Sequence, residues 1–237
     1  IYHNIAPITI ATIMEKANIT DTSKAAASNT HSVKPKPIYD FVKRVFDIVC
    51  SLIGLIVLSP VFIILSILIK TTSEGPAFFA HKRVGKGGKT IKIYKFRSMV
   101  TNAEELIKQF TPEQKAEYEK NFKLENDPRV TKVGKFMRKT SLDELPQLIN
   151  ILKGDISVVG PRPVMDVETK IYGNYRDMLL SVKPGLTGFW AANGRSATTY
   201  TRRRAMEIYY VKNRSVLLDL KIIFKTFISV FKRVGAV

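Results

Sequence analysis

The stretch IVCSLIGLIVLSPVFIILSILI, Ile48–Ile69, decides the fold of this chain, because its 22 residues include no charged side chain. As a helix with a rise of ~1.5 Å per residue, it would reach ~33 Å, close to the hydrocarbon thickness of a bilayer. The alternative is a helix buried in a protein core, but such helices are rarely apolar on every face over this length. The stretch therefore predicts a membrane-embedded element.

Ser59-Pro60 lies just past the middle of this stretch, where proline removes one helical hydrogen bond and clashes with the preceding turn. Basic residues flank the stretch on both sides, among them Lys43 and Arg44 before it and Lys70 after it. A spanning helix usually has more positive charge on its cytoplasmic side. Equal flanks fit a helix that bends and returns to the same face, but the residues fit an ordinary span with a tolerated proline equally well.

Net charge indicates the kind of partner this chain binds, and cysteine content bears on disulfide bonds. The 237 residues carry a formal net charge of +18, which implies an anionic partner: nucleic acid, anionic lipid or a phosphorylated substrate. The single cysteine, Cys50, excludes an internal disulfide and reads as a small buried side chain. The apolar stretch begins far from Ile1 and lacks a small-residue cleavage pattern, so it does not resemble a removable signal peptide.

The distribution of residues divides the chain into three segments. Residues 1–37 end in a small, polar, proline-punctuated run that is typical of a flexible linker. Residues 38–70 form the membrane element, and residues 71–237 form a folded domain. Within this domain, residues 77–84 and 90–96 flank a glycine-rich turn and predict a β-hairpin. Because helical patterns dominate elsewhere, we expect an α+β fold that is mainly helical.

The predicted hairpin is strongly basic, and Lys95 and Arg97 lie in or beside its second strand. Taken alone, this charge is more simply explained as a sheet edge protected from aggregation. Two helices elsewhere have clear signals. Thr111-Pro112 starts one of them, with Gln114 placed to close a capping box. The last helix, Val216–Arg233, carries an apolar stripe that fits a helix in the membrane surface as well as one docked on its own domain.

The pair Asp143-Glu144 lies in the densest part of the sequence, MRKTSLDELPQLINILKGDISVVGPRP. One reading is a capping box, because Ser141 precedes Glu144 by three residues and acids at a helix start suit the helix dipole. Pro146 instead favours a helix that begins near Asp143, since proline is tolerated only in a first turn.

In the second reading, the two acids lie at the helix mouth between Arg138 and Arg162. Carboxylates gathered with several cations suit phosphate chemistry with a divalent metal. A structural cluster of salt bridges would look the same in the sequence.

From about Pro37 to its end, the chain resembles the bacterial sugar transferases, the monotopic polyprenyl-phosphate phosphoglycosyl transferases. The resemblance covers roughly 200 residues. It rests on separated motifs in order: KRVFDIV at 43–49, the Ser59-Pro60 break, KIYKFRSM at 92–99, DPRVTKVGKFMRKTSLDELPQLINILKGD at 127–155, SVVGPRP at 157–163, KPGLTGFW at 183–190 and NGRS at 193–196. The LDELPQL and GPRP blocks together are the most specific of these.

The resemblance implies a fold and a site. The apolar stretch would be a re-entrant helix hairpin broken at Ser59 and Pro60, and the catalytic domain would lie on the cytoplasmic face of a bacterial inner membrane. Asp143 would be the nucleophile and Glu144 its partner in a dyad, with Mg²⁺ as the cofactor held by both carboxylates. The residues expected to bind substrate phosphates are Arg138, Arg162, Lys95 and Arg97.

The implied reaction has two steps. Asp143 would attack the phosphate attached to the sugar of a UDP-sugar and expel UMP, which leaves a covalent phosphosugar on the enzyme. The phosphate of an undecaprenyl phosphate carrier would then attack and free the aspartate. Since both substrates are anionic, magnesium and arginines would offset the repulsion. The product would feed a surface glycan such as a capsule, exopolysaccharide or the O-antigen of lipopolysaccharide.

Finer details favour the hexose-1-phosphate branch, such as the undecaprenyl-phosphate galactose phosphotransferases, with galactose or glucose as the sugar. These details are GPRPVMDVE at 160–168, Arg195-Ser196 followed by Thr198 and Thr199, and the ending FKRVGA at 231–236. Long members of this branch carry extra N-terminal transmembrane helices, and the sequence leaves open whether such a region precedes Ile1. The resemblance is also compatible with a homodimer.

Some residues depart from the family pattern. Ala191 and Ala192 stand where glutamine and a β-branched residue are common, and Glu207 stands where an aspartate is usual. The main rival function is a membrane-anchored scaffold or nucleic-acid-binding protein that uses its basic charge without turnover. We find no nucleic-acid recognition motif, so no nucleic-acid partner is expected. A second rival is a degenerate transferase that only binds the carrier lipid, and the intact Asp143-Glu144 pair argues against it.

Overall fold

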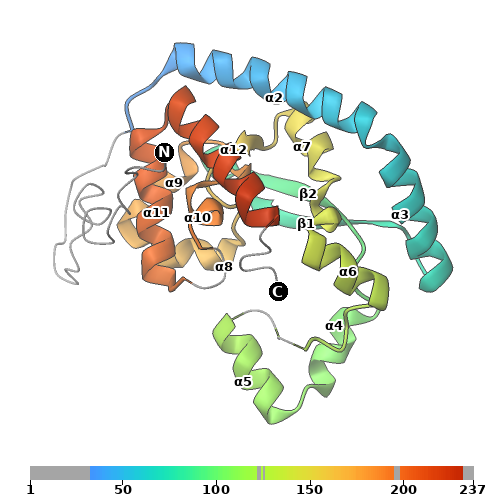
Figure 1. Cartoon of the computed structure of the whole chain (residues 1–237). Helices are drawn as coiled ribbons and strands as arrows, with labels where there is room; N and C mark the ends of the chain where they lie inside the picture. The colour runs from blue at the N-terminus through green and yellow to red at the C-terminus, as the bar shows by residue number, and fades with distance from the viewer. Residues whose placement is uncertain (1–32, 122–123, 125, 195–197, 232–237) are drawn as a thin grey trace, which may run out of the picture.

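The computed structural model describes residues 33–121, 124, 126–194 and 198–231 (Figure 1). Almost all of the predicted linker therefore lies outside the described residues, as do Arg195 and Ser196 and the end of the FKRVGA motif. Two helices lead into the remainder of the chain, α2 (Pro37–Val57) and α3 (Ser59–Thr72). The elements that follow are β1 (Phe78–Val84), β2 (Thr90–Phe96), α4 (Ala103–Leu106), α5 (Pro112–Asn121), α6 (Lys132–Thr140), α7 (Gln147–Lys153), β3 (Ser157–Val159), α8 (Asp166–Thr169), α9 (Arg176–Leu180), β4 (Gly185–Thr187), α10 (Phe189–Ala192), α11 (Tyr200–Asn213) and α12 (Val216–Phe231).

The bend between α2 and α3 follows from the chemistry of Ser59-Pro60. Pro60 has no N–H to donate to the carbonyl of Ile56, four residues earlier. The Ser59 hydroxyl donates to that carbonyl instead, at 2.8 Å. Pro60 lies in the first turn of α3, where a helix loses nothing by a missing N–H. The chain therefore restarts as a helix in a new direction, at 60° to the first.

The two faces of α2 are reversed relative to a helix on a water-exposed surface. Its inner face carries Arg44, Asp47 and Ser51, and the last two are buried. Its outer face is apolar and exposed, with Phe41 at 71% and Ile53 at 56%. A surface helix in water turns its apolar side inward. No single helix in the described part of the chain is long and apolar enough to cross a membrane, whereas α2 and α3 together could by length and composition.

Four hydrogen bonds hold this inner face to the rest of the protein. The Arg44 guanidinium donates to the carbonyls of Ile151 and Leu152 at 2.7 and 2.8 Å, which satisfies carbonyls at the end of α7. The Asp47 carboxylate accepts from the Ser157 hydroxyl and from the Val158 N–H, both at 2.9 Å. The bent helix pair is thus fixed directly to α7 and β3.

The predicted hairpin is confirmed as β1 and β2, which pair antiparallel from Phe78 opposite Phe96 to Val84 opposite Thr90. The side chain of Asn150 on α7 covers the other edge of β2. Its oxygen accepts from the Tyr94 N–H at 2.9 Å, and its nitrogen donates to the Lys92 carbonyl at 2.6 Å. A buried asparagine thereby takes the place of a third strand.

A second sheet, which the sequence reading did not predict, consists of the parallel pair β3 and β4. Both strands are only three residues long, and their signal was hidden in turn-like GPRP and KPGLTG sequences. The backbones of these two segments approach closely because Gly160 and Gly185 lack side chains. A Cβ at either position would collide with the backbone opposite.

The C-terminal helices enclose the largest core. Fully buried residues of α11, such as Ile208 and Val211, pack with Ile222 of α12 and with residues of α9 and α10. On its other side, α12 exposes Leu220 and Phe224. One side of α12 therefore docks on its own domain, as one of the two predictions had it. The other side presents the apolar stripe that a helix in the membrane surface would have. The mainly helical α+β fold is confirmed, and so is the Thr111–Gln114 capping box.

Arg97 ends the hairpin and holds the end of α3. Its guanidinium donates to the carbonyls of Ser73 and Glu74 and to the Ser73 hydroxyl. We predict that Arg97→Lys lowers the free energy of unfolding by about 1–3 kcal/mol, because one ammonium cannot reproduce the forked set of contacts. Denaturant unfolding in detergent measures this loss. Arg176→Lys, at an arginine whose side chain is 45% exposed, is the matched control and should be nearly neutral.

Candidate active site

The segment that carries Asp143 and Glu144 is a tight turn between two helices. Thr131 caps α6 by accepting from the Gly134 N–H at 2.9 Å, and α6 ends at Ser141 in the left-handed conformation, with φ of 58°. A single 3₁₀ turn, Leu142–Glu144, follows, and α7 begins only at Gln147. The predicted capping box at Ser141 is therefore wrong, whereas the predicted start near Asp143 is met only by this 3₁₀ turn and not by the α-helix. Ser141 terminates the preceding helix and makes no side-chain cap, so the acids lie in a connection and not in a regular first turn.

Asp143 is a buried carboxylate beside a lysine from the hairpin. Its side chain is 10% exposed, and Oδ2 lies 3.6 Å from Nζ of Lys95. The same ammonium is 2.7 Å from Oε1 of Glu144. Burial raises the pKa of Asp143, while the charge of Lys95 opposes this rise. Lys95 thus bridges both members of the predicted dyad.

Arg138 approaches the dyad from α6. Its Nε donates to the Ser98 hydroxyl at 3.0 Å, which orients the guanidinium. Burial lowers the pKa of Arg138, and the charge of Asp143 partly offsets this effect. The Asp143 carboxylate is therefore stabilised by cations from two separate elements, β2 and α6.

A cleft opens beside this cluster, and Arg162 lies on its rim. The residues that line the cleft are Arg83, Ile93, Lys95, Glu144, Gln147, Gly160, Arg162, Pro163, Gly185, Leu186, Thr187, Gly188, Trp190, Ala191 and Glu207. The Arg162 guanidinium lies 5.6 Å from the Trp190 ring centre, and Arg203 lies 4.9 Å from the same ring. The predicted residues Lys95, Glu144 and Arg162 thus share one cleft with the indole of Trp190.

Sequence reasoning missed three charged residues that belong to this region. Arg83 of β1 and Arg203 of α11 both approach Glu168, at 3.6 and 3.4 Å. Among the described residues, Nη1 of Arg83 and Nη2 of Arg203 are buried nitrogens without a hydrogen-bond acceptor. The alternation of side chains along a strand could have found Arg83. It shares a hairpin face with Ile93 and Lys95, whereas Lys82 and Lys92 lie on the other face.

The structure places Arg97 apart from the other predicted phosphate ligands. Its guanidinium is occupied by the end of α3, as described above, whereas Lys95 and Arg162 line the cleft and Arg138 lies beside Asp143. Ser59 and Pro60 lie at the α2–α3 bend, as predicted.

Asp143 and Glu144 suit a magnesium ion that is shared with a substrate. Mg²⁺ keeps several waters and usually takes one or two protein carboxylates together with substrate phosphates. Two adjacent carboxylates beside a cleft match this requirement. Within the described residues, no group of three or more His, Cys, Asp or Glu side chains is arranged to hold a metal by itself.

Glu207 is a second buried acid at the cleft. Its Oε1 accepts from the Arg162 N–H at 3.1 Å, and burial raises its pKa to about 7. Because the folded state holds this proton more tightly than the unfolded state, the contribution of Glu207 to stability falls as pH rises from about 4.5 through 7.

We predict that Glu207→Gln flattens this dependence. Between pH 5 and pH 8, the wild type should lose roughly 2.5 kcal/mol of unfolding free energy relative to the variant. Denaturant unfolding of both proteins across this range measures the difference. A difference that does not change with pH would contradict the assignment of the titration to Glu207.

Known proteins resemble the chain over most of its length. The family described as bacterial sugar transferase matches residues 38–233. An undecaprenyl-phosphate galactose phosphotransferase of Salmonella typhimurium is 50% identical over 199 residues, which are 83% of this chain and 42% of that protein. The exopolysaccharide production protein ExoY of Sinorhizobium fredii is 44% identical over 194 residues, 81% of this chain and 86% of ExoY.

A third relative acts on a different hexose. The UDP-glucose:undecaprenyl-phosphate glucose-1-phosphate transferase of Escherichia coli is 39% identical over 207 residues, 80% of this chain and 42% of that protein. The chain thus spans less than half of the Salmonella and Escherichia proteins and most of ExoY. The expectation drawn from the motifs is confirmed: this chain belongs to the bacterial sugar transferase family.

Proposed function

We propose that this chain transfers a hexose-1-phosphate, galactose or glucose, from a UDP-sugar to undecaprenyl phosphate and releases UMP. The observation that carries the proposal is the buried Asp143 carboxylate, which lies among cations at the edge of a cleft in a chain of this family. The names of the Salmonella and Escherichia relatives support the two substrate classes. ExoY, which this chain covers almost fully, supports a role in making a surface glycan.

In the first step, a carboxylate oxygen of Asp143 attacks the phosphorus that carries the sugar. The new bond is an acyl phosphate, and the bond to the oxygen of UMP breaks, so UMP leaves with the electron pair. Covalent catalysis of this kind divides one transfer into two easier steps. The aspartate must be ionised to attack, and Lys95 at 3.6 Å favours the ionised form against the effect of burial.

In the second step, a phosphate oxygen of the carrier lipid attacks the same phosphorus. The acyl phosphate bond breaks, the Asp143 carboxylate is regenerated and the sugar is left on a lipid diphosphate. The dyad partner Glu144 is held by Lys95 at 2.7 Å. Asp143 and Glu144 would hold Mg²⁺, which would supply positive charge to offset the negative charge that develops during transfer.

The cationic side chains of the cleft position the substrates. Phosphoryl transfer depends mainly on alignment and on stabilisation of negative charge. Arg162 and Arg83 line the cleft beside the dyad and supply guanidinium groups that match phosphate oxygens in pairs. Trp190 lines the same cleft, and its indole is a flat surface on which a nucleotide base or a sugar ring would stack.

The second substrate is a lipid, which agrees with a re-entrant position of α2 and α3 in the inner membrane. The outer faces of both helices are apolar, with Ile63 at 61% and Ile67 at 57% exposed on α3. The stripe on α12, with Phe224 at 68%, adds a helix suited to the membrane surface. We place the domain on the cytoplasmic face, where UDP-sugars are made.

Asp143→Asn tests the nucleophile. We predict that UMP release from a UDP-galactose and UDP-glucose panel, with undecaprenyl phosphate and magnesium, falls by at least ~1,000-fold. Without the carrier, wild type should retain sugar label from radioactive UDP-sugar in a form that hydroxylamine releases, and the variant should not. Asp177→Asn, at a side chain that is 94% exposed, is the matched control and should keep both activities.

Two other results would count against the proposal. UMP release by Asp143→Asn at the wild-type rate would remove Asp143 from the nucleophile position. Folded wild type that is silent with every UDP-sugar would favour a scaffold or a carrier-binding protein without turnover.

The re-entrant position predicts that both ends of the helix pair lie on one side of the membrane. In a Cys50→Ala background, Lys34→Cys and Thr72→Cys place a thiol before α2 and at the end of α3, both at exposed positions. A membrane-impermeant maleimide should label neither thiol in intact spheroplasts and both after permeabilisation. Labelling of only one of them in intact spheroplasts would show an ordinary crossing.

A further inference from the structure

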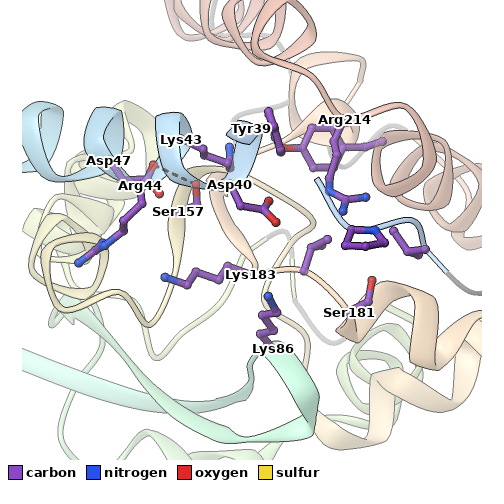
Figure 2. Close-up of a pocket in the computed structure, with 14 residues that line it drawn as sticks. Tyr39, Asp40, Lys43, Arg44, Asp47, Lys86, Ser157, Ser181, Lys183 and Arg214 are labelled. Carbon is purple, nitrogen blue, oxygen red and sulfur yellow. Dashed lines mark hydrogen bonds between the residues drawn. The ribbon is translucent and has the colours of Figure 1, made fainter. Parts of the chain in front are cut away.

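A second cavity lies under the first turns of α2, away from the cleft (Figure 2). Its volume is about 340 Å³, within the range of small-molecule sites. Its walls come from α2, the hairpin turn, the start of β3, the loop before β4 and the α11–α12 connection. No residue that lines it also lines the cleft beside Asp143.

Most charges around this cavity are positive. Lys43, Arg44, Lys86, Lys183 and Arg214 line it, against Asp40 and Asp47. Part of this charge is used within the fold. Lys43 pairs with Asp219 at 2.6 Å, Arg44 caps α7, and Arg214 donates to the carbonyls of Val211 and Lys34.

Two lysines remain without such a contact. Among the described residues, the ammonium groups of Lys86 and Lys183 make no hydrogen bond and no ion pair. Lys86 rises from the hairpin turn and Lys183 comes from the loop before β4, and both reach the cavity in Figure 2. Burial, together with the charges of Arg44 and Lys86, lowers the pKa of Lys183. The fold thus gathers cations in a partly buried space.

The carboxylates do not balance this charge. Asp47 is occupied by Ser157 and Val158, and it offsets only part of the repulsion at Lys183. Asp40 faces the same space but is exposed, as Lys86 is, so water and salt screen both charges, whereas Lys183 is half-buried. An anion of two or more oxygens, held by ammonium groups from two elements, would remove the remaining imbalance.

We infer that this cavity binds a phosphate group, held by Lys86 and Lys183 with the Arg44 guanidinium beside them. The source that the position favours is the headgroup of an anionic membrane phospholipid. Phe41, Val42 and Val45 lie on the outer side of the same turns of α2, at 71%, 43% and 46% exposure, and the proposed membrane position puts them at the bilayer surface. The choice of a lipid source rests on that proposed position, whereas the phosphate site itself does not.

The test compares two double variants of the full chain in a non-ionic detergent. Lys86→Gln/Lys183→Gln removes the two lysines of the cavity. Lys89→Gln/Lys92→Gln removes the same charge from exposed positions of the same hairpin and touches neither the cavity nor the cleft. The probes are inorganic phosphate, dihexanoyl-phosphatidylglycerol and, as the zwitterionic comparison, dihexanoyl-phosphatidylcholine.

At about ten times the dissociation constant, phosphatidylglycerol should raise the Tm of the wild type and of the control variant by about 3–5 °C. The cavity variant should lose this rise. Without any probe its Tm should equal or exceed that of the wild type, because it has lost two mutually repelling cations. A purely structural role for these lysines would instead lower the Tm of the unliganded variant.

The pattern of responses identifies the source and separates this inference from the proposed function. A rise with phosphatidylglycerol alone supports a lipid headgroup, and an equal rise with inorganic phosphate supports a free phosphate or phosphorylated metabolite. Equal responses in both double variants, or none in the wild type, would overturn the site. UMP release is measured on the same samples. Silence there with a retained Tm response rejects only the proposed transfer reaction, and the reverse result rejects only the cavity site.

Discussion

The contact between Asp47 and the start of β3 connects the apolar helix pair α2–α3 to the rest of the protein. Burying a carboxylate that is 2% exposed is costly without hydrogen bonds, and here the Ser157 hydroxyl and the Val158 N–H both donate to Oδ1 of Asp47. The strand that Asp47 fixes leads within three residues to Gly160 and Arg162 at the cleft. On the same helix, Arg44 fixes the end of α7, whose other end follows the Asp143 turn. The apolar helix pair is thereby coupled to both sides of the site.

The excess of positive charge is divided among separate tasks. One group of cations completes the fold, since Arg44 and Arg97 satisfy carbonyls at the ends of α7 and α3. A second group surrounds the carboxylate of Asp143. A third lines the cavity under α2. In the first two groups the arginine or lysine comes from one element and its partner from another, so the net charge of +18 is not a uniform property of the surface.

The parts that the sequence predicted are those with local signals. The hairpin pairing follows from two strands and a glycine-rich turn. Ser59-Pro60 alone fits a bend and an ordinary span equally well, and it is the family resemblance that implies the bend. The pair β3–β4 has no such signal, because strands of three residues carry little periodicity and their partners are distant in sequence. The left-handed Ser141 is equally hidden, since a serine before two acids is also the pattern of a helix cap. The sequence motif predicted that Arg97 lies beside the hairpin. It did not predict that the Arg97 guanidinium binds the end of α3, because that contact depends on the tertiary fold.

In the proposed reaction, the balance of charge around Asp143 decides whether this buried carboxylate can act as the nucleophile. Burial favours the protonated carboxylic acid, which cannot attack a phosphate, and Lys95 and Arg138 oppose that effect. If these cations bound the carboxylate too firmly, its oxygen would lose nucleophilicity. The ammonium of Lys95 is closer to Glu144, at 2.7 Å, than to Asp143, at 3.6 Å. Glu144 thus holds the Lys95 ammonium close to Asp143 without a short direct contact between lysine and aspartate, although the charge of Glu144 itself raises the pKa of Asp143.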